Sequence, residues 1–92
     1  MTAFVYILTN KIHSVLYIGV TTDLQRRVGE HKSGEVKGFS QRYKTDKLIH
    51  AEQFLDIEMA IQREKAIKKW KRQWKDTLIA RSNPQWDEIL PY

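Results

Sequence analysis

The sequence contains no cysteine, and none of its apolar runs approaches the ~20 residues that a membrane-spanning helix needs. A chain without cysteine can form neither a disulfide framework nor a thiolate metal site. The N-terminus also lacks the basic and then apolar layout of a secretory signal. We therefore expect a soluble cytoplasmic protein that does not bind membranes.

What the sequence does contain is enough apolar material for one folded domain. Its 92 residues are 41% hydrophobic and include three Trp, four Tyr and three Phe. Disordered chains combine low hydrophobicity with high charge, and this composition does not fit that class. No repeat, low-complexity tract or linker interrupts the chain, so we expect a single domain over residues 1–92.

Positive charge is in excess and unevenly distributed. A net charge of +5 and a pI near 9.6 give a field that attracts polyanions. Basic residues crowd around Trp70 and Trp74, where they could contact phosphates while the indoles stack on bases. The alternative is a solvated helix face whose tryptophans belong to the core. The candidate nucleic-acid-binding residues are Lys68, Lys69, Lys71, Arg72, Lys75, Arg42 and Lys44.

Two β-favouring segments begin the chain. Residues 3–8 and 15–20 are apolar, and the short polar segment between them predicts an antiparallel hairpin. A loop centred symmetrically would place Tyr6 directly across from Tyr17. The hairpin thus predicts two phenols side by side on one face of a sheet.

A helix follows, and we expect it to open at Thr21 or Thr22 and to end at Ser33-Gly34. Arg27 and His31 are spaced to lie on one side of it, next to its apolar stripe. The polar loop at 35–46 is long for a small domain. It could be a binding segment, a mobile flap or a plain surface loop.

A third strand is expected at 47–54, followed by a helix with Asp56 as N-cap. The apolar arc of that helix consists of Ile57, Ala60 and Ile61, with Ile67 flanking it, and Glu64 projects into its middle, where an unpaired carboxylate would be costly. It must meet a cation, a hydrogen-bonding group or a cleft, and an ion pair with Lys68 is the simplest alternative. A further helix is expected from Trp70 or Arg72 to about residue 80, before Asn83-Pro84.

Several of these segments together resemble one enzyme family. Val5-Tyr6-Ile7, then Tyr17-Ile18-Gly19, then Arg27 ten residues after Tyr17, resemble the GIY-YIG nuclease module. Residues 63–70, Leu78-Ile79 and Asn83-Pro84-x-Trp86 resemble its small stand-alone branch, which is related to the nuclease domain of the bacterial excinuclease C subunit. The resemblance implies an α+β fold in which a three-stranded antiparallel sheet is flanked by helices, in the order β-β-α-β-α-α.

The resemblance also implies a reaction, the hydrolysis of nucleic-acid phosphodiester bonds with one divalent ion, Mg²⁺ or Mn²⁺. Tyr6 and Tyr17 would lie beside the scissile phosphate, and one of them, Tyr6 by preference, would help to deprotonate the attacking water. Arg27 would bind the phosphate. Glu64 would hold the metal. Gly19 would let the backbone approach closely.

Other positions carry weaker implications. His31 matches a family position one helical turn past the arginine and could bond phosphate or shuttle a proton. Asn83 could correspond to a polar residue near the site. Phe4 and Val5 depart mildly from the first motif, and Val20 stands where some members have a lysine. A cation is then missing beside the phosphate unless another residue, such as Lys44, replaces it.

Three functions remain open at this point. The first is an endonuclease acting on DNA, with branched, nicked or damaged DNA as candidate substrates, as a monomer or weak dimer. The second is a nucleic-acid-binding module with the same fold and little activity. The third is a protein-interaction domain whose basic helix docks an acidic partner. We expect no separate targeting domain, so the basic helices of this chain or a protein partner would have to supply targeting.

Overall fold

The computed structural model describes residues 2–91. The strands are β1 (Ala3–Thr9), β2 (Leu16–Thr21) and β3 (Lys47–Phe54), and the helices are α1 (Leu24–Lys32), α2 (Phe39–Tyr43), α3 (Ile57–Lys69) and α4 (Arg72–Ser82). The α+β class and the three-stranded antiparallel sheet are confirmed, and the bounds of β3 match those expected. The element order is β-β-α-α-β-α-α, because a short helix interrupts the predicted loop. Within residues 2–91 no helix is both long and apolar enough to cross a membrane.

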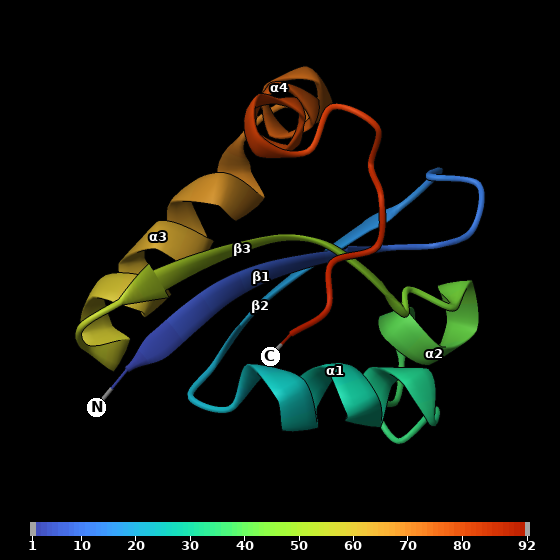
Figure 1. The fold of residues 1–92 in the computed structure, drawn as a ribbon, viewed down its shortest axis with the longest axis horizontal. Helices are drawn as coiled ribbons and strands as arrows, with labels where there is room; N and C mark the ends of the chain where they lie inside the picture. Colours follow the sequence, from blue (N-terminus) through green and yellow to red (C-terminus); the bar gives the residue numbers. More distant parts are fainter. Residues whose placement is uncertain (1, 92) are drawn as a thin grey trace.

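The sheet separates two layers of packing. Its strand order is β2-β1-β3, so the most apolar strand, β1, lies in the centre. Side chains alternate between its faces: Val5 and Ile7 pack with Ala60, Ile67 and others from α3 and α4. On the other face, Tyr6 and Leu8 pack against α1. Figure 1 shows α1 below the sheet and α3 and α4 above it.

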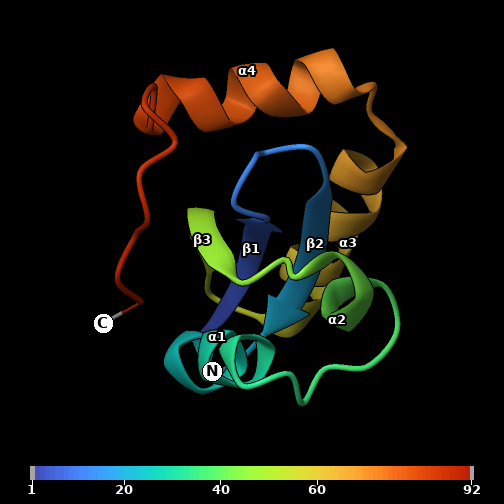
Figure 2. The same cartoon turned by 90° about the vertical axis from the view of Figure 1, so that its right-hand side faces the viewer.

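The C-terminal segment covers the edge of the sheet that β3 forms (Figure 2). Beyond α4 the chain turns back along β3, where the Ile89 amide donates to the Leu48 carbonyl at 2.8 Å. Asn83 fixes this return by donating to the carbonyls of Ile49 and Asp87. Figure 2 shows the C-terminal segment on the β3 side, with α3 and α2 on the β2 side. The edge of β2 is therefore the side not covered by the C-terminal segment.

The predicted hairpin register is wrong. Tyr6 pairs with Gly19 and Tyr17 pairs with Leu8, a shift that preserves the face of every side chain. The cause is the turn. The Asn10 side chain accepts from the Ser14 amide at 2.8 Å and donates to the Ser14 hydroxyl at 2.7 Å, which keeps residues 10–15 out of the ladder. The two phenols still share a face, but they lie diagonally.

The first helix begins later than expected. Asp23 is its N-cap and accepts from the Arg26 amide at 3.1 Å, so the predicted capping box at Thr22 does not form. Thr21 accepts from the Asp23 amide at 3.0 Å and fixes the approach to the helix. An aspartate is a better cap than threonine, which explains the choice. The predicted end at Ser33-Gly34 is confirmed.

The predicted loop contains α2. Gly38 precedes this helix with φ of 80°, and Lys44 ends it in the left-handed region with φ of 55°. The rings of Phe39 and Tyr43 pack against each other at 4.7 Å. Ser40, the second residue of α2, is buried. A helix this short has no apolar periodicity to reveal it.

The apolar arc expected on α3 is only half buried. Ala60 and Ile67 are fully buried, whereas Ile57 and Ile61 are 38% and 37% exposed. The buried stripe thus lies to one side of the arc that the sequence indicated. Asp56 caps the helix as predicted, accepting from the Met59 amide at 2.8 Å.

Candidate active site

Tyr6 and Tyr17 meet on the sheet face that α1 covers. Their ring centroids are 6.2 Å apart with an interplanar angle of 28°. The Tyr6 side chain is buried to 1% exposure and crosses over Gly19 on the neighbouring strand. A Cβ atom at position 19 would lie 2.5 Å from the Tyr6 hydroxyl and 2.6 Å from Cζ. Glycine is therefore required here to seat a phenol ring and not only to leave room for a ligand.

Gly19→Ala should consequently displace Tyr6 and destabilise the fold by about 1–3 kcal/mol, the usual cost of overpacking a core. Urea unfolding followed by tryptophan fluorescence measures this difference. Gly29→Ala is the matched control, since a Cβ atom at position 29 meets nothing within 4 Å. Alanine stabilises an exposed helical position by about 0.5–1 kcal/mol relative to glycine, so this variant should not lose stability. Equal stability of the Gly19→Ala variant and the wild type would contradict the close contact.

Arg27 joins this cluster from α1. Its Nε–H donates to the Tyr6 hydroxyl at 3.3 Å, and its Nη1–H donates to Glu30 at 3.0 Å. Glu30 also binds Arg26 at 3.3 Å, so this carboxylate orients both guanidinium groups. The Arg27 side chain is 37% exposed. It therefore touches the buried phenol and is also accessible to a ligand from solvent.

His31 lies one turn further along α1 and links the phenols to α2. Its Nε2 is 3.2 Å from the Tyr6 hydroxyl and its Nδ1 is 2.6 Å from the Ser40 hydroxyl. Ser40 in turn lies 2.6 Å from the Thr45 hydroxyl. The imidazole also meets the Tyr17 ring edge-on at 4.7 Å. In the tautomer with hydrogen on Nδ1, that nitrogen donates to Ser40, and Nε2 can accept from Tyr6.

Ser40, Thr45 and Glu30 are the members of this cluster that sequence reasoning missed. Ser40 and Thr45 are 3% and 0% exposed, yet they carry no motif and lie in the segment expected to be a polar loop. The contact of Ser40 with His31 arises only when α2 folds against α1. Glu30 could have been found, because it is spaced for ion pairs with both Arg26 and Arg27 on a helix.

Burial sets the protonation of the cluster. It raises the pKa of Tyr6 to about 12, although the hydrogen bond from Arg27 opposes the rise. Burial and the charge of Arg27 lower the pKa of His31 to about 4. The hydrogen bonds to Tyr6 and Glu30 raise the pKa of Arg27. At neutral pH the phenol is protonated and the imidazole is neutral, whereas a phenol that acts alone as the base would need a lowered pKa.

The low pKa of His31 makes stability depend on pH. The ordinary value is 6.5 and the folded value about 4, so the unfolded chain binds more protons between these limits. The stabilisation is complete above pH 6.5 and is lost as the pH falls toward 4. We expect the free energy of unfolding, measured with urea, to fall across this window, and His31→Gln to flatten the slope. An unchanged slope in the variant would show that other groups cause the loss.

Glu64 comes from α3, which packs on β2 and β1 from the other face of the sheet. It lies on the same side of this helix as Ile57, Ile61 and Lys68. Ile57 lines a groove with Arg27, and Lys68 lines another with Tyr17 and Phe39. Within residues 2–91, Tyr6, Tyr17 and Arg27 share one cluster, whereas Glu64 makes no hydrogen bond or ion pair with any of the three.

The Glu64 carboxylate is 18% exposed and pairs with Lys68 at 3.5 Å, the alternative considered from sequence. Within residues 2–91, no three His, Cys, Asp or Glu side chains converge as a metal cage would require. A single carboxylate still fits Mg²⁺ or Mn²⁺, because these ions retain waters and take further oxygens from phosphates. Glu64 fits that kind of site, since among the described residues its one ionic partner is Lys68, and that ion pair is long.

The other predicted residues divide into three groups. Lys68 and Lys75 line the groove beside Tyr17, and Lys44 lines a groove with His31. Arg72 and Asn83 instead stabilise the fold: Arg72 donates to the His13 and Ser14 carbonyls and pairs with Asp76. Lys69 and Lys71 are exposed, and Arg42 lies over the Tyr43 ring at 5.6 Å.

Comparison with known proteins shows the family of this chain. Residues 2–77 match the GIY-YIG catalytic domain. A UPF0213 protein of Natronomonas pharaonis is 38% identical over 77 residues, covering 84% of this chain and 89% of the relative. A UPF0213 protein of Streptococcus pneumoniae is 34% identical over 90 residues, covering 98% and 88%.

A solved structure has the same fold. The solution NMR structure of a UPF0213 protein from Bacillus halodurans superposes with a TM-score of 0.60 at 30% identity, covering 95% of this chain and 92% of the other. Sequence and fold therefore agree along nearly the whole chain. This protein belongs to the GIY-YIG family.

Proposed function

We propose that this protein is a divalent-metal-dependent endonuclease that hydrolyses phosphodiester bonds in DNA. The observation that carries the proposal is the contact of Arg27 with the Tyr6 hydroxyl, beside Tyr17 and the neutral imidazole of His31. An arginine fixed next to a phenol provides two groups at one place. The guanidinium can bind the charge of a phosphate, and the phenol can accept a proton and pass one on. A module that only binds DNA needs no such pair.

In the proposed reaction, a phosphate enters at the β2 edge and meets the accessible part of the Arg27 guanidinium. A water molecule beside Tyr6 attacks phosphorus, and the bond to the leaving oxygen breaks. The Tyr6 oxygen accepts a proton from that water while its own proton passes to His31 Nε2. This transfer avoids a free phenolate, which the raised pKa of Tyr6 disfavours, and it requires the negative charge of the bound phosphate to raise the low pKa of His31.

The remaining residues position these groups. The Ser40 hydroxyl binds Nδ1 of His31, which leaves Nε2 available to accept the Tyr6 proton. Glu30 holds Arg27, and Gly19 seats the Tyr6 ring. A divalent ion, when bound at Glu64, supplies positive charge to the leaving oxygen. Lys68 and Lys75 would contact the flanking phosphates of the strand.

The test is cleavage of end-labelled linear, nicked and branched DNA with Mg²⁺ or Mn²⁺, with and without EDTA. We expect cleavage of at least one substrate and its loss with chelator. Cleavage that persists in EDTA would rule out the metal-dependent reaction. Binding of every substrate without any cleavage would identify the protein as a DNA-binding module.

A further inference from the structure

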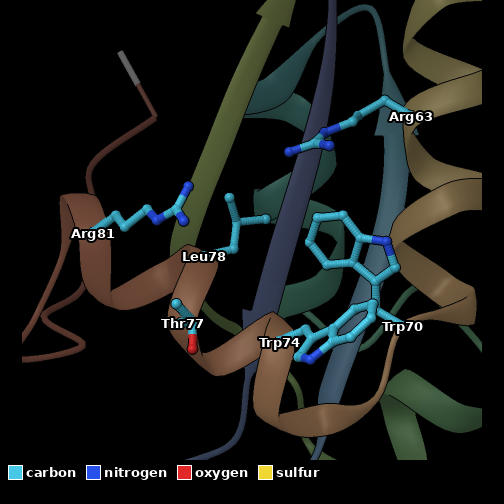
Figure 3. Close-up of a pocket in the computed structure, with 6 residues that line it drawn as sticks. All are labelled: Arg63, Trp70, Trp74, Thr77, Leu78 and Arg81. Atoms are coloured by element: carbon cyan, nitrogen blue, oxygen red, sulfur yellow. The ribbon is translucent and has the colours of Figure 1, made fainter.

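A recess between α3 and α4 lies on the opposite face of the sheet from the Tyr6 cluster. Its volume is about 370 Å³, within the range of small-ligand sites. Figure 3 shows Arg63 reaching into it from α3 and Arg81 from α4, with Leu78 and Trp70 between them. Two arginines and two tryptophans line it, and no acidic side chain does. The lining residues are Arg63, Trp70, Trp74, Thr77, Leu78 and Arg81.

Arg63 forms a fixed wall of this recess. Its Nε–H and Nη2–H donate to the two carboxylate oxygens of Glu52 at 2.8 and 3.2 Å. Its guanidinium carbon lies 5.1 Å from the centre of the Trp70 ring. Because the Glu52 carboxylate and the Trp70 ring already hold this guanidinium, it loses little conformational entropy when a ligand packs against it.

Trp74 and Arg81 are the accessible members. Trp74 is 58% exposed, an unusual state for so large an apolar side chain. It meets Trp70 edge to face, with centroids 6.4 Å apart and an angle of 73°. Arg81 is exposed, and no carboxylate in residues 2–91 pairs with it. The recess thus offers an uncovered indole beside an unneutralised cation.

From these features we propose that the recess binds an unpaired nucleotide, whose base stacks on Trp74 and whose phosphate meets Arg81. The inference rests on the proposed function and adds a substrate class, DNA that carries a single-stranded segment. Base-paired DNA hides its base faces, so a duplex could use Arg81 but not the indole. An acidic peptide would neutralise Arg81 and also leave the indole face uncovered.

The test is the affinity of the whole protein for a labelled oligo-dT strand and for a blunt duplex, by fluorescence anisotropy in EDTA at one low salt concentration. Trp74→Ala should weaken binding of the single strand about tenfold, the loss of one stacked base, with duplex affinity unchanged. Trp74→Phe keeps an aromatic face and should restore most of the affinity. Because Trp74 is exposed, both variants should fold.

The contribution of the Arg81 charge needs a separate control. Arg81→Gln should weaken binding of the single strand more than Lys11→Gln, which removes one exposed charge elsewhere. Equal single-strand affinity of Trp74→Ala and wild type would overturn the proposal. Equal losses of affinity for the single strand and the duplex in Trp74→Ala would also overturn it. The same holds if a poly-glutamate peptide quenches the tryptophan fluorescence of the protein as strongly as oligo-dT does. Binding is measured without cleavage, so a failed nuclease assay and a failed recess are separate results.

Discussion

Arg27→Ala should reduce the rate of DNA cleavage by about 100- to 1,000-fold, the usual cost of removing a group that stabilises transition-state charge. The side chain touches the Tyr6 hydroxyl and is also accessible from solvent, so its loss removes both a phosphate contact and the partner of the phenol. The rate is measured at saturating substrate to separate chemistry from binding. Arg27→Lys keeps the charge without the planar fork and should recover only part of the rate.

Arg26→Ala is the matched control. Arg26 is the neighbouring arginine and binds the same carboxylate, Glu30, but its side chain is 76% exposed. It makes no contact with the phenols among residues 2–91. Its removal deletes the same charge from the same helix and should change the rate by no more than a few-fold. Equal losses in the two variants would reduce the role of Arg27 to general electrostatic attraction.

Glu64→Gln should abolish the metal dependence of cleavage, with a loss of at least about 100-fold, since metal stabilisation of the leaving oxygen contributes several kcal/mol. Affinity for DNA should hold or increase, because Lys68 loses its carboxylate partner. A variant that binds better but cleaves far less distinguishes a role in chemistry from a role in binding.

The second readout for Glu64 is metal binding itself, followed as Mn²⁺-induced broadening of backbone amide signals. We expect broadening centred on the β2-facing side of α3 in the wild type and its loss in Glu64→Gln. Glu58→Gln, in the first turn of the same helix, is the control and should leave the broadening unchanged. Broadening that persists without Glu64 would place the ion elsewhere.

The sequence predicted the parts of the fold that depend on local pattern. The third strand, the cap at Asp56 and the positions of Arg27 and His31 on one helix face all follow from residue spacing. The hairpin register was wrong because the Asn10 side chain controls the turn, and an apolar pattern does not reveal where a ladder stops. The face of each phenol was nonetheless correct, because the shift preserves alternation.

The contacts of the candidate site that escaped prediction are tertiary. Ser40 reaches His31 only because Gly38 and Lys44 adopt left-handed backbone angles at the two ends of α2. The raised pKa of Tyr6 depends on how deeply the ring is buried over Gly19, which the sequence does not specify. Residue spacing also does not indicate the burial of His50, whose Nε2 lies 2.9 Å from a Glu52 carboxylate oxygen.

The most direct measurement compares the wild type with the Arg27→Ala/Glu64→Gln double variant, purified side by side and shown to be equally folded. Both are assayed on the same labelled nicked and branched DNA with Mn²⁺. The account predicts cleavage that co-elutes with the wild-type protein and is absent from the variant. Equal cleavage by both proteins would show that this cluster does not carry out the reaction.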